Sequence, residues 1–239
     1  MPLRGYPLAI GQSELKDSAI QEHDLGMPAI DNLGRRFRYA KAGALALVAG
    51  NVLQSPAWDT QQAALAVPAA YAIGVTTVTV TNGTTAVVAG EYAGGVLVTE
   101  VTPGEGYTYP IISNSAAANG AAITVIIAYG LQVAWTTATK VSLHYNEYNG
   151  VIQAPVTTLT GIPVGVAVYP ITAAYYGWIG TGGTHGTFIK GTPALGQALA
   201  GVAGTAGEAA INSGTTAIIG NIRVTGVDGK VKPVYWTLD

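Results

Sequence analysis

The sequence predicts an all-β protein, folded as an antiparallel, hairpin-rich sandwich or barrel. Segments such as TTVTVT and AITVII alternate β-branched residues with a period of two, the pattern of strands with one buried face. Asn-Gly or Asp-Gly occurs at 82–83, 119–120, 149–150 and 228–229, and these dipeptides favour hairpin turns with positive φ. Helix-like segments are short, because Pro68 limits DTQQAALAVPAAYAI and glycines interrupt GQALAGVAGTAGEAA.

Residues 1–34 show neither helical nor strand periodicity, and they are expected to form an extended N-terminal arm. One helical turn, capped by Ser13, fits SELKDSAIQEH. From RRFRYAKAGALALVAG onward the pattern is that of strands. The predicted organisation is a hairpin-rich β domain over 35–150 and a second β region over 151–239, which can join 35–60 in a single domain. The sequence leaves open whether 60–150 forms a separate lobe.

Charge is scarce and unevenly placed along the chain. Charged residues make up 10% of the 239 residues, against about 25% in a typical soluble domain. Eleven of the 24 charged side chains (six basic and five acidic) lie within residues 1–41. A lone globule with so few surface charges is expected to be poorly soluble. The composition therefore predicts that copies of the chain, or a partner, cover much of its surface.

The same composition argues against several functional classes. A net charge of −2 provides no field for nucleic acid and no basic face for anionic lipid, and no apolar run is long enough to span a membrane. The absence of cysteine removes disulfides and thiolate metal sites. No apolar secretion signal follows the first residues, so the chain is expected to be made and assembled in a cytoplasm.

The stretch YYGWIGTGGTHGTFIKG, residues 175–191, resembles a phosphate-binding glycine loop only superficially. A dinucleotide fingerprint starting at Gly180 requires glycine at 185, where His185 stands, and a Walker loop requires lysine after its last glycine. We therefore expect no cofactor here and interpret the glycines as a structural turn.

Other candidate catalytic or metal-binding residues are isolated. His23, His144 and His185 lack the close pairing of zinc ligands, so no metal site is predicted. Glu100 and Glu105 flank a Pro-Gly turn, and a glycosidase pair requires carboxyl groups that face each other across a cleft. No catalytic residue is predicted, and the protein is expected not to be an enzyme.

Two clusters are predicted to form an interaction surface. Arg35, Arg36, Arg38 and Lys41 form either a solvated strand start or a patch that docks an acidic partner. Tyr175, Tyr176 and Trp178 lie on a predicted strand, where alternation places Tyr176 and Trp178 on one face and Tyr175 on the other. An exposed aromatic face would suit an interface, since interfaces favour tyrosine and tryptophan.

Several longer blocks resemble the capsid decoration (cement) proteins of tailed bacteriophages. They are RRFRYAKAGALALVAGNVLQ, EYAGGVLVTEVTPGEGYTYPIISN, KVSLHYNEYNGVI, PVGVAVYPITAAYYGWIGTGGTHGTFIKGTPALGQAL and VKPVYWTLD, which together span most of residues 35–239. The resemblance implies a β-barrel or β-tulip fold and a structural, non-enzymatic role. It also implies a homotrimer on the exterior of the virion capsid, held partly by an N-terminal arm, with no catalytic residues to transfer.

The resulting hypothesis is a virion structural protein that stabilises the mature phage capsid by clamping adjacent subunits of the major capsid protein. Two alternatives remain at this point. One is a tail- or fibre-associated virion protein. The other is a carbohydrate-binding or hydrolytic β protein that uses Tyr176, Trp178 and an acid such as Glu105.

Overall fold

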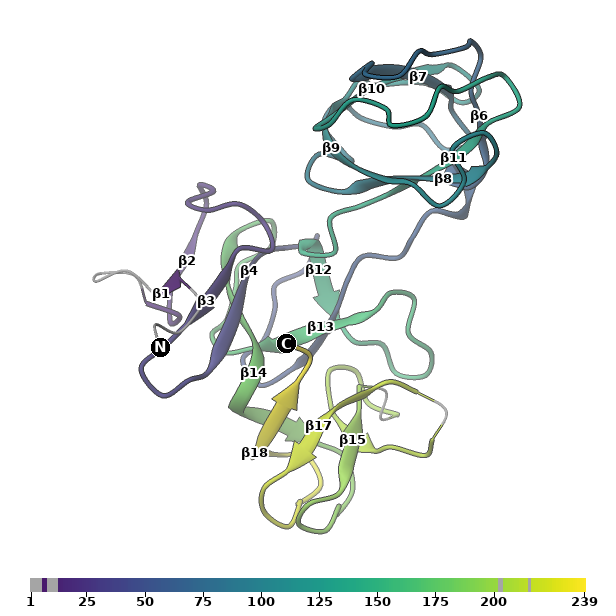
Figure 1. Cartoon of the computed structure of the whole chain (residues 1–239). Helices are drawn as coiled ribbons and strands as arrows, with labels where there is room; N and C mark the ends of the chain where they lie inside the picture. Colours follow the sequence, from purple (N-terminus) through teal and green to yellow (C-terminus); the bar gives the residue numbers. More distant parts are fainter. Residues whose placement is uncertain (1–5, 8–12, 202–203, 215) are drawn as a thin grey trace. The chain divides into compact units, whose positions relative to one another are not determined.

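The computed structural model describes residues 6–7, 13–201, 204–214 and 216–239, and it confirms the all-β prediction (Figure 1). Strands make up 42% of the structure and helix 1%. The helical content of the described residues is one 3₁₀ turn, Thr60–Gln62, whose N-cap Asp59 accepts a hydrogen bond from the Gln61 amide. Within these ranges no helix has the length and hydropathy of a membrane span.

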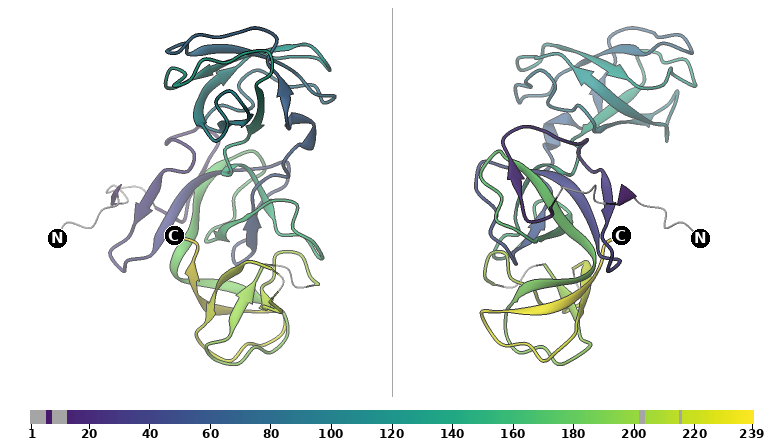
Figure 2. Two further views of the ribbon diagram at one scale, coloured as in Figure 1. Left: turned by 45° about the vertical axis from the view of Figure 1, so that its right-hand side comes forward. Right: turned by 90° about the vertical axis from the view of Figure 1, so that its left-hand side faces the viewer.

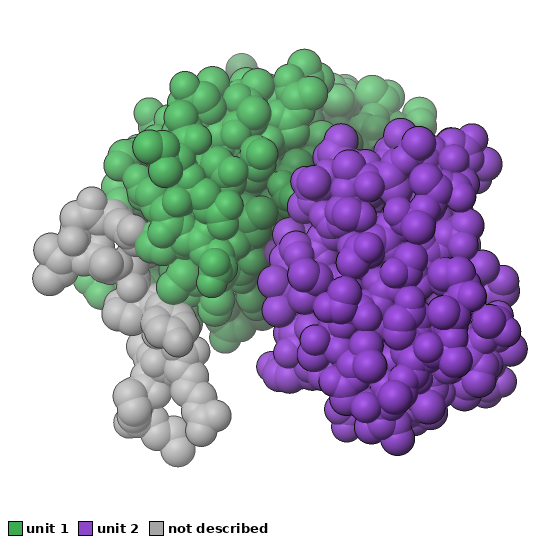
Figure 3. Space-filling view, turned by 90° about the horizontal axis from the view of Figure 1, so that it is seen from above, with its two compact units in different colours: residues 1–57, 147–239 green, residues 58–146 purple. Residues whose placement is uncertain are grey.

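The chain divides into two compact units, which Figure 3 colours separately. Unit 1 comprises residues 1–57 and 147–239, and unit 2 comprises residues 58–146. The expected boundaries at 34/35 and 150/151 differ from this division. The physical reason is that β5 (Val52–Gln54) and β12 (Asn149–Gln153), on either side of unit 2 in sequence, pair with each other, so both belong to unit 1.

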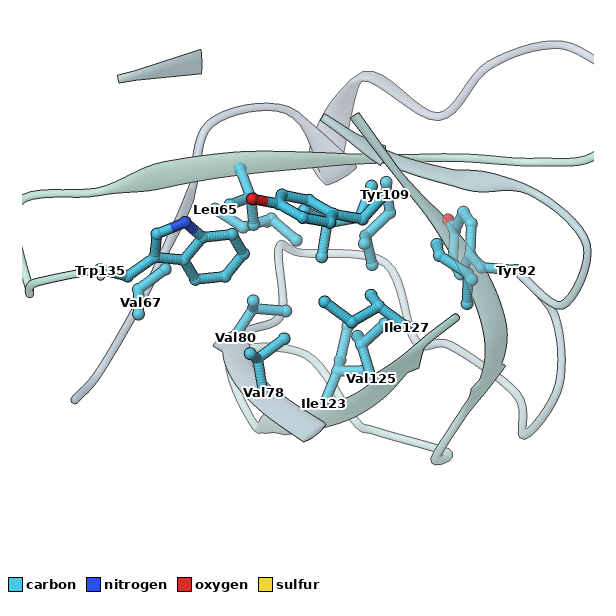
Figure 4. Close-up of a cluster of buried hydrophobic side chains, with 14 of the residues drawn as sticks. Leu65, Val67, Val78, Val80, Tyr92, Tyr109, Ile123, Val125, Ile127 and Trp135 are labelled. Atoms are coloured by element: carbon cyan, nitrogen blue, oxygen red, sulfur yellow. The ribbon is translucent and has the colours of Figure 1, made fainter. Parts of the chain in front are cut away.

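Unit 2 is one barrel-like sheet around a single hydrophobic core. Its strands pair in the order β6-β11-β8-β9-β10-β7. They are β6 (Leu65–Ala66), β7 (Thr77–Thr81), β8 (Val96–Val101), β9 (Thr108–Asn114), β10 (Ala122–Ile127) and β11 (Lys140–His144). Alternate residues of β10 are buried, so Ile123, Val125 and Ile127 point into the core beside Tyr109 and Trp135 (Figure 4). Period-two alternation therefore determines which side chains fill this unit.

Part of unit 1 is a closed five-stranded ring. The pairings run β4-β12-β5-β13-β14 and return to β4, so these five strands have no free edge along the ring. Here β4 is Arg36–Ala42, β13 is Pro163–Ala167 and β14 is Tyr176–Ile189. Ala42, Leu53, Val151 and Ile179 are among its buried core residues.

The 14-residue strand β14 joins this ring to a second group of strands (Figure 2). Its first half, Tyr176 to Gly182, pairs with β4, and its second half, Gly182 to Ile189, pairs with β18 (Lys230–Thr237). The group continues through β17 (Ile218–Ile222), β15 (Ala198–Ala200) and β16 (Ala210–Ile211). The interpretation of the glycines at 180–186 as a structural turn is therefore wrong, because they lie within the longest strand of the protein, whereas the strand predicted for Tyr176 and Trp178 is present.

The predicted N-terminal arm is, in its described part, a folded portion of unit 1. Strands β2 (Asp17–Ser18) and β3 (Pro28–Ile30) pair with β14 and β4, and β1 (Tyr6–Pro7) pairs with β3. Ala29 is buried, and Leu25 and Met27 pack beside it, which explains why 13–34 does not extend freely. The Ser13 hydroxyl accepts a hydrogen bond from the Leu15 amide, but no helix follows. Residues 1–5 and 8–12 of the predicted arm lie outside the described residues.

The four predicted hairpin turns have mixed outcomes. Residues 119–120 lie between the paired strands β9 and β10, and 228–229 lie between the paired strands β17 and β18, so hairpins are present there. Asn82 instead follows β7, which pairs with the distant β10, and Asn149-Gly150 lies inside β12. Asn82 is buried, and its side-chain amide offsets the cost of burial by donating to the carbonyls of Thr85 and Ala118.

Candidate interaction surface

Arg35, the first residue of the basic cluster, is neutralised within the chain. Its Nε lies 2.6 Å from Asp31 Oδ2, and its Nη2 lies 2.9 Å from Glu14 Oε1. Its guanidinium also lies over the Phe37 ring, 5.3 Å from the centroid. Burial opposes ionisation of Asp31, but hydrogen bonds from the backbone and side chain of Arg35 keep the pKa of that carboxyl below its ordinary value.

Arg38 is likewise occupied, by a carboxylate 201 positions away in sequence. Its Nε and Nη2 donate to the two carboxylate oxygens of Asp239 at 2.9 and 2.7 Å, and its Nη1 donates to the Gly26 carbonyl at 2.9 Å. Thr181 Oγ1 also donates to Asp239 at 2.7 Å. The hydrogen bonds from Arg38 lower the pKa of Asp239 in spite of its burial, and the same pair raises the pKa of Arg38. This two-pronged geometry is the strong form of a charge-assisted bond.

Arg36 and Lys41 are the two cations of the cluster that lack such a partner. Arg36 is exposed, and no ion pair within 4 Å joins it to any residue that the structure describes. Lys41 is half-buried, with its ammonium 5.4 Å from the centroid of the Tyr176 ring. The hypothesis of a four-cation docking patch therefore narrows to Arg36, because Lys41 lies five residues further along β4 against the Tyr176 ring.

The predicted aromatic residues form a packed cluster around Tyr39. Tyr176 stacks on Tyr39 at a centroid distance of 6.1 Å, and Trp178 contacts it edge-on at 5.1 Å. His23 contacts both Tyr39 and Trp178. Trp178 is only 5% exposed, so it is a core residue rather than an interface anchor. Tyr175, which directly precedes β14, is 37% exposed and remains accessible.

The hollow that Tyr176 and Trp178 line is too small for a sugar. A hollow of about 20 Å³ is lined by Ser13, Lys16, Asp17, Ser18, Glu22, Tyr39, Tyr176, Gly177 and Trp178. Such a volume holds about one water molecule. Tyr176 and Trp178 therefore do not form the open aromatic surface that the carbohydrate-binding hypothesis requires.

The glycine-rich strand contains a buried histidine. His185 is 3% exposed, and its Nε2 lies 3.0 Å from the Gly182 carbonyl oxygen. A side chain at Gly180 would lie 2.8 Å from the His185 ring, and Gly183, at φ +82°, lies directly against Arg35. Burial lowers the pKa of His185 below its ordinary value, so the neutral imidazole is favoured. These glycines serve close packing at the junction within β14.

The other predicted catalytic candidates are distributed over both units. His144 stacks on Trp58 in unit 2, at 4.8 Å between centroids, whereas His23 and His185 belong to unit 1. Glu100 accepts a hydrogen bond from Ser142, and Glu105 is exposed. Across the described ranges, no group of three or more His, Cys, Asp or Glu side chains could hold a metal ion.

Sequence analysis missed three residues that shape this surface. Asp31 carries a signal in retrospect, because its spacing of four from Arg35 suits an ion pair. Asp239 carries none, because only the folded chain brings it to Arg38. Tyr39 alternates with Phe37 on β4, which indicates burial but not its role as the centre of the aromatic cluster.

Comparison of the chain with protein-family models, curated proteins and solved structures finds no match. The interpretation of this surface therefore depends on its geometry and on the chemistry of its residues.

Proposed function

We propose that this protein is a virion structural protein that binds the outer surface of a mature phage capsid. It acts as a homotrimer and stabilises the shell by clamping adjacent subunits of the major capsid protein. The resemblance in the sequence suggests this role, and the character of the protein surface supports it.

The observation that carries the proposal is an apolar surface with little charge to keep it in solution. Six large apolar side chains of the described residues are two-thirds or more exposed: Ile20, Leu33, Leu45, Ile73, Tyr129 and Leu195. They occur in both units. Of the charges that could offset them, Arg35, Asp31 and Glu14 pair with one another and leave one net negative charge. Scattered apolar residues are normal on a surface, but combined with so few charges they favour a protein covered by neighbours.

A clamp of this kind gains strength from repetition. Each contact can be modest, because many copies bind the same shell and a bound trimer engages several subunits at once. A surface of uncharged threonine, alanine and isoleucine suits such contacts, since desolvating it costs less than desolvating ions.

Sedimentation with purified shells tests the proposal. The protein should pellet with expanded, undecorated capsids, saturate at a fixed ratio to the major capsid protein and raise the temperature at which the shells rupture. Unexpanded shells are the control, and sedimentation velocity of the free protein should report a trimer. A monomer that stays in the supernatant at every concentration would overturn the proposal.

A further inference from the structure

A groove of about 300 Å³ lies beside the unpaired cation of the surface. It is lined by Pro28, Ala29 and Ile30 of β3, by Arg36, Phe37 and Arg38 of β4, and by Asp239. Pro28 is exposed and Ile30 half-buried, so one wall offers apolar contact to a ligand, while Phe37 is fully buried within it.

The charges in the groove are unequal in availability. All three guanidinium nitrogens of Arg38 donate hydrogen bonds, Nε and Nη2 to Asp239 and Nη1 to the Gly26 carbonyl, so few donors remain for a ligand. Asp239 is held by Arg38 and Thr181, and the charge of Arg36 also contributes to lowering its pKa. Arg36 is exposed, and among the described residues it takes part in no ion pair. The groove side chains thus carry one spare positive charge, at Arg36.

We propose that this groove binds a single carboxylate side chain of the partner protein, with Arg36 as its recognition residue. The guanidinium can take both carboxylate oxygens through two parallel N–H donors. Pro28 and Ile30 accept the methylene stem, which favours glutamate over aspartate. The identification of the partner as the major capsid protein rests on the proposed function above, whereas the chemistry of the groove does not.

The neighbouring carboxylate sets the selectivity of the groove. Asp239 is kept ionised by Arg38, so it repels a second negative charge placed next to the first. One spare cation beside a fixed anion suits one carboxylate and disfavours phosphate, which carries more charge, or a nucleic-acid backbone, which carries a row of charges.

Peptide titration tests the groove without any capsid. The probes are acetyl-Ala-Glu-Ala-amide, its glutamine analogue and inorganic phosphate, added to the full-length protein and followed by NMR of the Arg36 Nε–H and the Ile30 methyl groups. We expect saturable shifts of both signals with the glutamate peptide, much smaller shifts with the glutamine peptide, and loss of the Ile30 methyl shift in Arg36→Gln. Equal shifts with both peptides, no shift at millimolar concentration, or stronger binding of phosphate would overturn the inference.

Capsid binding supplies the second arm. Arg36→Gln keeps the aliphatic stem against Gly182. Arg223→Gln is the matched control, because Arg223 is exposed and its side chain bonds only Thr184 among the contacts described. Arg36→Gln should raise the Kd for expanded shells about tenfold, at the low end for a close charge pair, and flatten its salt dependence. Arg223→Gln should leave the Kd unchanged.

The two arms separate the inference from the proposed function. If wild-type protein ignores shells but binds the glutamate peptide through Arg36, the groove stands and the capsid role fails. If wild-type protein and Arg36→Gln bind shells equally, with no peptide shift, the capsid role stands and the groove inference fails.

Discussion

Unit 2 and unit 1 bury their hydrophobic side chains in different ways. Unit 2 is continuous in sequence, residues 58–146, and buries one core built from alternating strand residues. Unit 1 is assembled from two distant segments and divides its buried residues into three clusters, tied by hydrogen bonds and ion pairs such as Arg38–Asp239. Both units contain side-chain hydrogen bonds, such as that from Asn82 to Ala118 in unit 2, but the ion pairs within 4 Å among the described residues all lie in unit 1. The contrast shows that the discontinuous unit is the one that adds ion pairs to its packing.

Truncating the core of unit 2 should have the largest effect. Trp135 is 1% exposed, and Tyr71 and Tyr109 pack against it edge-on. We expect Trp135→Ala to destabilise unit 2 by about 3–5 kcal/mol, as large-to-small core substitutions do. Calorimetry should show one transition moving down while a second, assigned to unit 1, stays in place. A common shift of the whole unfolding profile would show that the two units unfold as one.

Removing an indole N–H should distinguish the polar character of the two cores. Trp236 Nε1 donates to Thr187 Oγ1 at 3.0 Å in unit 1, whereas Trp135 Nε1 has no hydrogen-bond partner among the described residues. Apart from the effect of the smaller ring, Trp236→Phe should lower the free energy of unfolding by about 1–3 kcal/mol, because the buried Thr187 hydroxyl loses its hydrogen-bond donor. Trp135→Phe should lower it through the smaller ring alone, since the Trp135 N–H has no partner to lose among the described residues. Denaturant unfolding of the matched pair measures the difference, and equal costs would contradict it.

Each unit contains a histidine whose pKa is lowered by burial, His144 in unit 2 and His185 in unit 1. The unfolded chain therefore binds these protons more readily than the folded one. Stability should be complete above the ordinary pKa of 6.5 and fall as the pH drops below it. His185 is the more deeply buried of the two, so we expect unit 1 to lose more stability than unit 2 as the pH falls.

Thermal melts between pH 5 and 8 check this expectation. His144→Gln should flatten the pH dependence of unit 2 and leave that of unit 1 unchanged. The lowered pKa values of Asp31 and Asp239 act in a separate, more acidic window, below the ordinary value of 3.8. A melting temperature that does not change between pH 5 and 8 would rule out the histidine contribution.

The smallest effect is expected at the exposed ion pair of the N-terminal segment. Lys16 and Glu22 lie 3.4 Å apart, with side chains 62% and 38% exposed. Lys16→Ala should change the stability of unit 1 by less than about 0.5 kcal/mol, because water screens such a pair. A loss above 1 kcal/mol in urea unfolding would mean that this pair, unlike most surface pairs, helps to hold β2 on β14.

Local patterns predicted the strands better than they predicted the partners of those strands. Thr77–Thr81 and Ala122–Ile127 were visible from alternation alone, because one face of each is buried. Their mutual pairing was not, because a hairpin signal at Asn82 describes only neighbours in sequence. The glycines of β14 suggested a turn, but Gly180 lies in a strand and leaves space for the ring of His185. This close contact cannot be inferred from the sequence.

The position of the basic cluster in the chain was visible from the sequence, but its charge balance was not. Sequence analysis identified the basic cluster at 35–41, and the structure places it on β4. Which of its cations is available depends on Glu14 and Asp239, which are separated from the cluster by up to 201 positions. Long-range ion pairing leaves no periodic trace, so Arg36 could not be distinguished from Arg35 and Arg38.

The pairing of Ile152 with Gln54 has a mechanical consequence. The chain enters unit 2 after β5 and leaves it before β12, and these two strands are paired. A force that pulls on unit 2 would therefore break the β5–β12 hydrogen bonds from one end, one after another. Each of these strands is flanked on its other edge, β12 by β4 and β5 by β13. The force would then act on the closed five-stranded ring, where further separation of the strands requires several strand pairings to break at the same time.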